Sequence, residues 1–225
     1  MSQIREVGKE RYGLALVLIL SSMVVVMAAP DNRFWEVVIL CLQAAALFAS
    51  LRAAQSDFRL RVACGVIIGI SLAGAINLAI FNGENSETFV RSASLLLVVL
   101  ATPVIALGLV RQVKQRRQIT IHTMMGVLCI YMLMGVAFAS SFALIHDLTG
   151  DPFFRQGDGT DSISNYLYFS LTTITTAGLG DFAPADKLGR SLTALEALIG
   201  QIYLVTVVAV IVSNLGRKRP DPASK

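Results

Sequence analysis

The chain is poor in charge. Only 15% of its 225 residues are Asp, Glu, Lys or Arg, whereas soluble domains carry about 25%. Hydrophobic residues make up 55% of the chain, and the mean hydropathy is +0.66. This composition excludes an ordinary water-soluble domain and predicts a chain that is surrounded mainly by lipid.

Cysteine is also scarce. The three cysteines, Cys41, Cys64 and Cys129, each lie inside an apolar stretch and form no CxxC pair, so we expect buried free thiols rather than a disulfide framework or a zinc site. The chain lacks an HExxH motif, a nucleotide-binding glycine loop and a recognisable Ser/His/Asp arrangement. We therefore predict that the protein is not an enzyme and needs no cofactor.

What the chain has instead is a series of long uncharged stretches. A helix needs about 20 apolar residues to cross the hydrocarbon core of a membrane. The second stretch is short, but Phe34 and Trp35 extend it to the interface, and the last extends backward past Glu196 to about Leu188. The pattern predicts an all-α membrane protein with six transmembrane helices, although the first stretch also has some features of a signal peptide. The stretches are Tyr12–Pro30, Val37–Leu51, Val62–Gly83, Ser92–Val110, Gln118–His146 and Ala197–Gly216.

The basic residues indicate the orientation of these helices. If the N-terminus lies inside, 14 of the 19 Lys and Arg residues fall in inner segments, as the positive-inside rule requires. We therefore expect a multi-pass protein with both termini in the cytoplasm, and the compact build suits a bacterial inner membrane. The basic clusters sit between apolar stretches, so we expect membrane lipid, and no nucleic acid, as a partner.

The segment between His146 and Leu188 does not fit the pattern of spanning helices. Residues 147–161 are polar and glycine-rich and predict a loop. Residues 162–175 form a half-apolar stretch that would be only about 20 Å long as a helix, and Asp161 or Ser162 is a suitable N-cap. This stretch predicts a re-entrant helix that enters the membrane and stops partway.

The next residues, Thr175–Pro184, contain two alternating glycines and cannot remain helical. Non-helical backbone at membrane depth occurs only where protein buries it or water bathes it. Glycines in alternate positions let successive carbonyl groups turn toward one axis, where they can replace the water shell of a cation. The Thr176 hydroxyl adds a further oxygen, and the C-terminal end of the preceding helix favours positive charge.

The run Thr-Ala-Gly-Leu-Gly-Asp at 176–181 resembles the T-x-G-Y-G-D selectivity filter of the potassium-channel pore-loop superfamily. The resemblance extends over about 119–216 and includes Pro184, Gly189 and Arg190. It implies a homotetramer around a central axis, with Gly200 as a candidate gating hinge, although a glycine there also permits close helix packing. It further implies that the filter consists of Thr176, Ala177, Gly178, Leu179 and Gly180, with potassium ions bound at the first four.

The filter departs from the family pattern at two positions. Leu179 replaces the usual aromatic residue and cannot donate a hydroxyl hydrogen bond, and Ala177 replaces the usual Val. Tyr168 and Phe169, on the predicted pore helix, are placed to pack against Leu179. Asp181 directly follows the filter and is expected to shape its outer end.

Two further residues are candidates for filter support. Thr172 stands on the pore helix where some relatives have Glu. Glu196 lies on the last helix, one turn before Gly200, and an ionisable residue inside a membrane usually faces protein or water. We hypothesise that Glu196 lies behind the filter and supports it through hydrogen bonds with pore-helix groups. The alternative is an interfacial glutamate that reaches the outer surface.

These observations predict three regions: residues 1–118, a four-helix transmembrane domain; residues 119–216, the pore domain; and residues 217–225, a short cytoplasmic tail. The fourth stretch has no charge between Arg91 and Arg111, whereas a voltage sensor carries several arginines across the field. The predicted function is passive, potassium-selective conduction without steep voltage dependence. Two alternatives remain, a weakly selective Na+/K+ channel and a non-conducting regulatory membrane subunit.

Overall fold

The computed structural model describes residues 11–28, 121–157 and 160–214, together with a few isolated helical positions between 35 and 106. This part of the chain is helical and contains no strand; one isolated bridge pairs Phe154 with Pro184. In chain order the elements are α1 (Arg11–Ala28), α5 (Ile121–Thr149), α6 (Ile163–Ile174), α7 (Lys187–Tyr203), the π-helical turn η2 (Leu204–Val208) and α8 (Ala209–Ser213).

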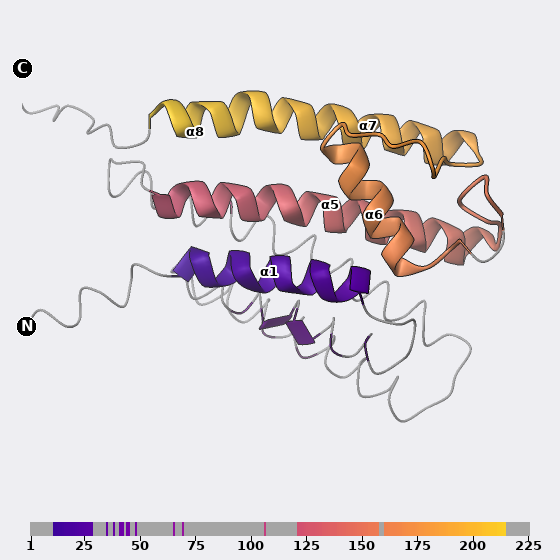
Figure 1. The fold of residues 1–225 in the computed structure, drawn as a ribbon, viewed down its shortest axis with the longest axis horizontal. Helices are drawn as coiled ribbons and strands as arrows, with labels where there is room; N and C mark the ends of the chain where they lie inside the picture. The colour runs from indigo at the N-terminus through magenta and orange to yellow at the C-terminus, as the bar shows by residue number, and fades with distance from the viewer. Residues whose placement is uncertain are drawn as a thin grey trace, which may run out of the picture.

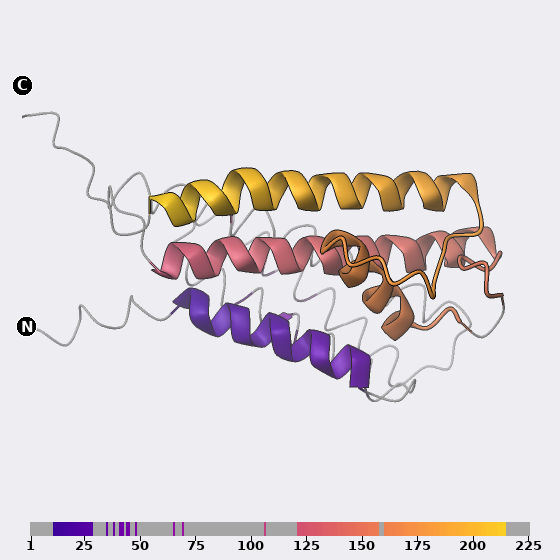
Figure 2. The same ribbon diagram turned by 45° about the horizontal axis from the view of Figure 1, so that its top comes forward.

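Two long rods dominate the arrangement. The first is α5, and the second is the continuous run of α7, η2 and α8, which lies beside α5 and runs in the opposite direction (Figures 1 and 2). The short helix α6 crosses obliquely between them, and residues 175–186 return from its end toward the start of α7. Helix α1 packs against α5 and α6. The segment between α5 and α7 is therefore held against both rods.

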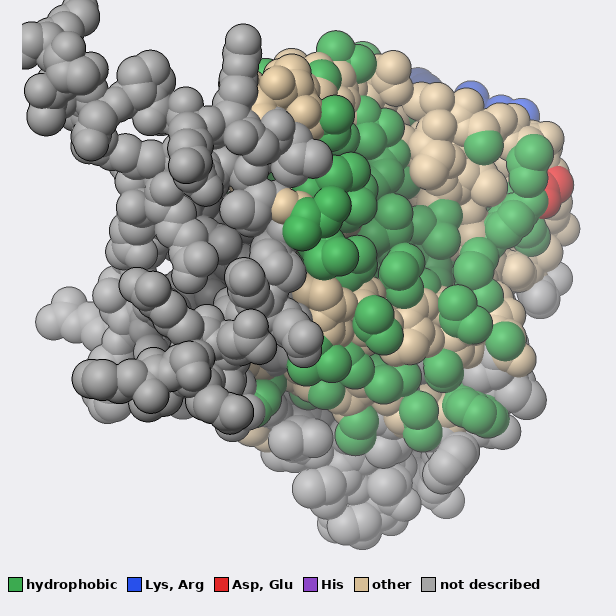
Figure 3. All heavy atoms as spheres, turned by 60° about the vertical axis from the view of Figure 1, so that its left-hand side comes forward, with side chains coloured by type: hydrophobic (Ala, Val, Ile, Leu, Met, Phe, Trp, Pro, Cys, Tyr) green, Lys and Arg blue, Asp and Glu red, His purple; other side chains and the backbone are tan. Residues whose placement is uncertain are grey.

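Both rods are long and apolar enough to cross a membrane, judged by length and composition. The two stretches are Thr123–Thr149, with a hydropathy of 2.1, and Lys187–Ser213, with a hydropathy of 2.2. In the space-filling view, hydrophobic side chains cover most of the described part of the face, and charged ones lie at its margin (Figure 3). These two helices match the fifth and sixth predicted spans to within a few residues.

The other predicted spans are tested less completely. Helix α1 covers the first predicted span, and its apolar part, Gly13–Ala28, is shorter than the two long rods. The predicted helices over 37–51, 62–83 and 92–110 and the tail 217–225 lie outside the described residues, apart from isolated positions. The six-helix topology therefore stays a prediction.

The core lies where α1, α5 and α6 meet. Apolar side chains of all three helices are buried there, among them Ile19, Leu133 and Leu167. Cys129 is buried, as expected, but Cys41 is exposed in this single chain, and Cys64 lies outside the described residues. The expectation of burial was wrong for Cys41, because an apolar run fixes only which residues avoid water and not which of them face the interior of one chain.

Candidate functional site

The N-terminal end of α6 is fixed by two side chains. Ser162 is the N-cap, and its hydroxyl accepts a hydrogen bond of 3.3 Å from the backbone N–H of Asn165. Asp161 does not cap the helix. Its Oδ1 instead accepts from the Tyr166 hydroxyl at 2.7 Å and from the backbone N–H of Phe153 at 3.3 Å. The cap holds the first turn, and Asp161 ties that turn to the loop before it.

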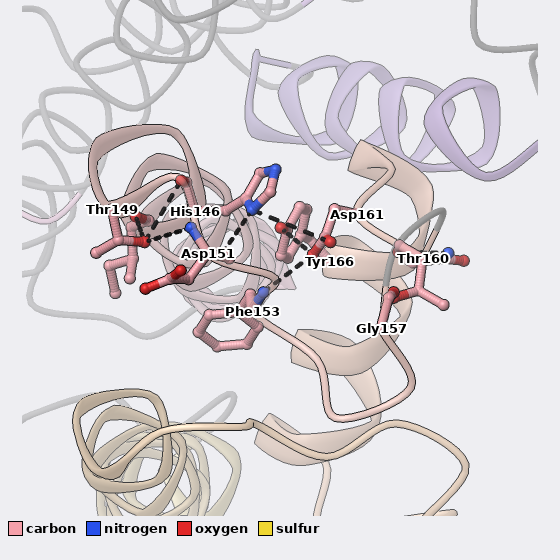
Figure 4. Close-up of polar contacts among 10 residues, drawn as sticks. His146, Thr149, Asp151, Phe153, Gly157, Thr160, Asp161 and Tyr166 are labelled. Carbon is pink, nitrogen blue, oxygen red and sulfur yellow. Dashed lines mark hydrogen bonds and ion pairs between the residues drawn. The ribbon is translucent and has the colours of Figure 1, made fainter.

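Figure 4 shows that the end of α5 joins the same cluster of polar groups. His146 Nδ1 donates to the Asp151 carbonyl at 2.8 Å and lies 4.0 Å from Asp161 Oδ2. Thr149 adds a bond from its hydroxyl to the carbonyl of Ile145 at 2.9 Å. The described residues of the connection between α5 and α6 therefore help to set where α6 begins.

One face of α6 is fully buried. Tyr166, Ser170 and Ile174 recur every four residues on this face and are at most 1% exposed, as side chains on one helix stripe are. Tyr166 stacks on Phe154, with ring centroids 5.2 Å apart. Phe169, which is 6% exposed, packs beside this face against Phe142. Aromatic packing and burial together fix the rotation of α6 about its axis.

Halfway along this face, Ser170 joins three helices. Its hydroxyl lies between two acceptors, the Gly135 carbonyl of α5 at 2.7 Å and Glu196 Oε1 of α7. Glu196 is 0% exposed, and its Oε2 has no hydrogen-bond partner among the described residues. Glu196 is therefore buried between α6 and α7 in the single chain, where it contacts the pore-helix residue Ser170, and its role in supporting the filter stays a prediction.

The segment after α6 has an alternating backbone. Thr176, Gly178 and Gly180 have positive φ angles of 59°, 51° and 82°, whereas no such angle occurs at Ala177 or Leu179. Left-handed angles come at little cost to glycine, but they are uncommon for a β-branched residue such as Thr176. This alternation lets neighbouring carbonyl groups turn to the same side, as a ring of cation ligands requires.

The base of this segment is tied to the end of α6. The backbone N–H of Gly178 donates to the carbonyl of Thr172 at 3.0 Å, and that of Thr176 donates to Thr173 at 2.9 Å. The Thr172 hydroxyl donates to the carbonyl of Phe169, within its own helix. Thr172 therefore contacts the predicted filter through its backbone, whereas the sequence drew attention to its side chain.

At the other end of the segment, Asp181 is held by its neighbours. Tyr168 of α6 is hydrogen-bonded to the Asp181 side chain, and this bond raises the pKa of Tyr168 above its ordinary value. The Gln156 side chain donates to the Asp181 carbonyl. The ring of Tyr168 also meets the ring of Phe182 at 6.0 Å. These contacts link the end of the segment to α6 and to the preceding loop.

A short backbone bridge reinforces that link. The N–H of Arg155 donates to the carbonyl of Ala183 at 2.9 Å, and the N–H of Ala185 donates to the carbonyl of Phe153 at 2.8 Å. Helix α7 then begins at its N-cap Asp186, which accepts from the N–H of Gly189 at 2.8 Å. The loop before α6 and the segment after it therefore form one unit that leads into α7.

Leu179 does not make the contacts expected from the sequence within one chain. Its side chain is 65% exposed, while Phe169 is enclosed by the aromatic cluster that includes Phe142 and Phe153. Tyr168 turns instead toward Asp181 and Phe182. The predicted packing of the two aromatic residues against Leu179 is therefore absent from the single chain.

Most predicted site residues do come together. Tyr168 and Thr172 belong to α6, and Glu196 and Gly200 belong to α7. The segment 176–181 connects these two helices, which pack against each other.

The sequence missed Ser170 and also Tyr131 of α5, whose hydroxyl donates to the carbonyl of Ile174 at the end of α6 at 2.8 Å. A serine and a tyrosine inside apolar stretches indicate that each hydroxyl needs a hydrogen-bond partner once it is buried. The sequence did not show which group that partner would be. Among the described residues, no group of three or more His, Cys, Asp or Glu could hold a metal ion.

Comparisons with known proteins show what this region is similar to. Residues 127–217 match the family described as "Ion channel". A probable potassium channel protein 2 of Methanocaldococcus jannaschii is 48% identical over 46 residues, which are 19% of this chain and 13% of that protein. The potassium voltage-gated channel protein shk-1 of Caenorhabditis elegans is 34% identical over 80 residues, covering 34% of this chain and 15% of the relative.

A third relative is the potassium voltage-gated channel subfamily A member 5 of Mus musculus, which is 30% identical over 90 residues, or 40% of this chain and 14% of the relative. The chain thus spans 13–15% of the length of these curated relatives. No solved structure matches the chain. The matches all describe ion channels, and the family match covers α6, the segment 175–186 and α7. Residues 127–217 are therefore similar to a family of ion channels, and the relatives that match parts of this chain are potassium channels.

Proposed function

We propose that this protein conducts K+ passively through a selectivity filter formed by Thr176, Ala177, Gly178, Leu179 and Gly180. The observation that carries the proposal is the alternation of positive φ at 176, 178 and 180 in the one exposed, non-helical segment between α6 and α7. Carbonyl groups turned to one side by this alternation replace the hydration shell of the ion. The ions would be bound at 176–179, with Asp181 at the outer mouth.

Four copies of the chain would complete this site. One chain supplies one row of carbonyl groups, and a ring around an ion requires several such rows related by cyclic symmetry. The segment that carries this row, 176–180, is exposed along its length in the single chain. So are apolar side chains of α7 and η2, including Leu195, Leu198 and Val205, which suit contact with neighbouring copies and with lipid. A homotetramer in a membrane accounts for both exposures.

The direction of the helices supports the membrane topology that we propose. Helices α1 and α5 run the same way, and α7–α8 runs back, so that the start of α1 and the end of α8 lie at the same end of the bundle (Figures 1 and 2). Three further spans between α1 and α5 are consistent with this geometry. We infer six spans, a re-entrant α6 and both termini in the cytoplasm, which the distribution of basic residues supports, with a bacterial plasma membrane as the setting.

A second candidate differs only in selectivity. The 65% exposure of Leu179, and its inability to donate a hydrogen bond, would leave the filter less firmly braced than an aromatic residue does. A looser filter discriminates less between Na+ and K+. The conduction pathway is the same in both cases, so one measurement separates them.

That measurement is the reversal potential of the purified protein in a planar bilayer with K+ on one side and Na+ on the other. A reversal shifted strongly toward the K+ equilibrium potential is expected. Current that reverses near zero would favour the weakly selective channel, and absence of any current from a folded tetramer would favour a regulatory subunit. The same recordings, taken over a range of voltages, should give a shallow conductance–voltage relation.

A further inference from the structure

The C-terminal end of α6 leaves four carbonyl groups without partners inside the helix, as every helix end does. Their partners show how the filter is joined to the pore helix. Three of them accept hydrogen bonds from the residues that directly follow. The bonds are Thr175 N–H to Leu171 at 3.2 Å, Gly178 N–H to Thr172 at 3.0 Å and Thr176 N–H to Thr173 at 2.9 Å.

The fourth carbonyl, that of Ile174, accepts from a different part of the chain. The hydroxyl of Tyr131, on α5, donates to it at 2.8 Å across 43 residues of sequence. Tyr131 is 4% exposed and Ile174 is 1% exposed, so water cannot easily replace this bond. A buried carbonyl group without a hydrogen-bond partner destabilises the folded protein. The Tyr131 hydroxyl therefore satisfies the last carbonyl group at the end of α6.

This carbonyl belongs to the peptide from which the filter starts. The Ile174–Thr175 peptide is planar, so the direction of its carbonyl fixes the direction in which the chain continues toward Thr176. Gly200 of α7 also approaches this peptide, and a Cβ on Gly200 would lie only 2.7 Å from the Ile174 oxygen. The peptide therefore contacts a hydroxyl of α5 and lies close to the backbone of α7.

The structure contains a natural control for this contact. Tyr203, at the end of α7, stacks on Tyr131 with ring centroids 6.0 Å apart and an interplanar angle of 19°. Its hydroxyl also donates to a backbone carbonyl at 2.8 Å, but the acceptor is Val127 within α5. The two tyrosines thus make the same kind of bond from the same stacked pair, and only Tyr131 reaches the base of the filter.

We propose that Tyr131 is a positioning residue of the selectivity filter: its hydroxyl holds the Ile174–Thr175 peptide and so sets the innermost ion site at Thr176. The proposal rests on the proposed function, since it needs a conducting filter. Tyr131 does not touch the ion. It acts through a carbonyl whose direction would otherwise be free to change.

The test compares Tyr131→Phe and Tyr203→Phe with the unchanged protein, each purified and recorded under bi-ionic K+/Na+ conditions. Both substitutions remove one hydroxyl and keep the ring and its stacking. We expect Tyr131→Phe to lower the K+/Na+ permeability ratio about tenfold, as the loss of one buried hydrogen bond at the ion site predicts. Tyr203→Phe should change that ratio by less than about twofold, because its bond lies within α5 and α7 alone.

A second readout, which needs no open channel, is the difference between the melting temperatures of the tetramer in KCl and in NaCl. An ion that binds in the filter stabilises the folded state and raises the melting temperature. Tyr131→Phe should lose the extra stability in KCl, and Tyr203→Phe should keep it. Equal effects of the two variants, no effect of Tyr131→Phe, or its failure to form a tetramer would each overturn the proposal. An unchanged protein without K+ current would overturn the proposed function instead, whatever the variants do.

Discussion

Gly200 and Ile174 approach so closely that no side chain fits between them. A Cβ on Gly200 would lie 2.5 Å from Ile174 Cγ1 and 2.7 Å from the Ile174 carbonyl oxygen. The helix α7 passes through Gly200 without interruption. The sequence left a hinge and close packing as equal alternatives for this glycine, and the contact supports close packing. Whether α7 also bends there stays a prediction.

Gly200→Ala should therefore destabilise the protein. Alanine favours a helix by about 1 kcal/mol over glycine, but forcing a methyl group against a backbone carbonyl costs about 1–3 kcal/mol, and overpacking should win. Gly135→Ala on α5 is the matched control, because its Cβ would meet the end of the flexible Leu171 side chain at 3.3 Å. Thermal melting of both variants decides the point: a Gly200→Ala protein as stable as Gly135→Ala would refute the close-packing role.

The contact between Ser170 and Glu196 predicts coupled effects. Ser170→Ala removes the hydroxyl that binds the buried Glu196 carboxyl and should cost about 1–3 kcal/mol of unfolding free energy. Because the two side chains share one bond, which Ser170→Ala and Glu196→Ala each remove, the effects of these two substitutions should not add, with a coupling of about 0.5–3 kcal/mol. Denaturation of the two single variants and the double variant measures this coupling, and strict additivity would contradict the contact.

Glu196 is also expected to act on the filter. It lies one turn before Gly200 and contacts the helix whose end holds the filter. Glu196→Gln should change conductance, selectivity or inactivation in bilayer recordings, because the amide keeps an acceptor for Ser170 but adds a donor without a partner. Recordings identical to those of the unchanged protein would remove Glu196 from the set of supporting residues.

Leu179→Tyr should raise selectivity. Leu179 is 65% exposed in the single chain, so a larger side chain meets no obstacle within its own subunit, and an aromatic hydroxyl adds a possible hydrogen bond that braces the filter. We expect the K+/Na+ permeability ratio to rise by about tenfold, the effect of one such bond. Leu179→Phe separates added packing from added hydrogen bonding. An unchanged ratio in both variants would show that Leu179 already suffices.

The bond between Tyr168 and Asp181 predicts a response to alkaline pH. The bond raises the pKa of Tyr168, so its protonated form is favoured in the folded state. The stabilisation is complete below the ordinary pKa of tyrosine, about 10, and is lost as the pH rises through the higher pKa of the folded state. The melting temperature of the unchanged protein should therefore fall more steeply above pH 10 than that of Tyr168→Phe. Parallel curves of melting temperature against pH would contradict the assignment.

Much of the local structure was readable from the sequence. The short helix was predicted over 162–175 and is found at Ile163–Ile174 with Ser162 as its cap, because capping and helix length depend on neighbouring residues. The alternating glycines indicated a backbone with unusual freedom, and the structure has positive φ angles at 178 and 180. The positive φ at Thr176 was not predicted, since nothing in a threonine favours it and the surrounding structure must impose it.

The sequence by itself determined that long apolar helices flank a short helix and a glycine-containing segment, because these features follow from hydropathy, length and the backbone freedom of glycine. Only the tertiary structure decided which groups meet. The partners of Ser170, of Gly200 and of Tyr131 come from helices distant in sequence. Such contacts depend on the rotation and depth of each packed helix, and a one-dimensional pattern constrains those only to a face.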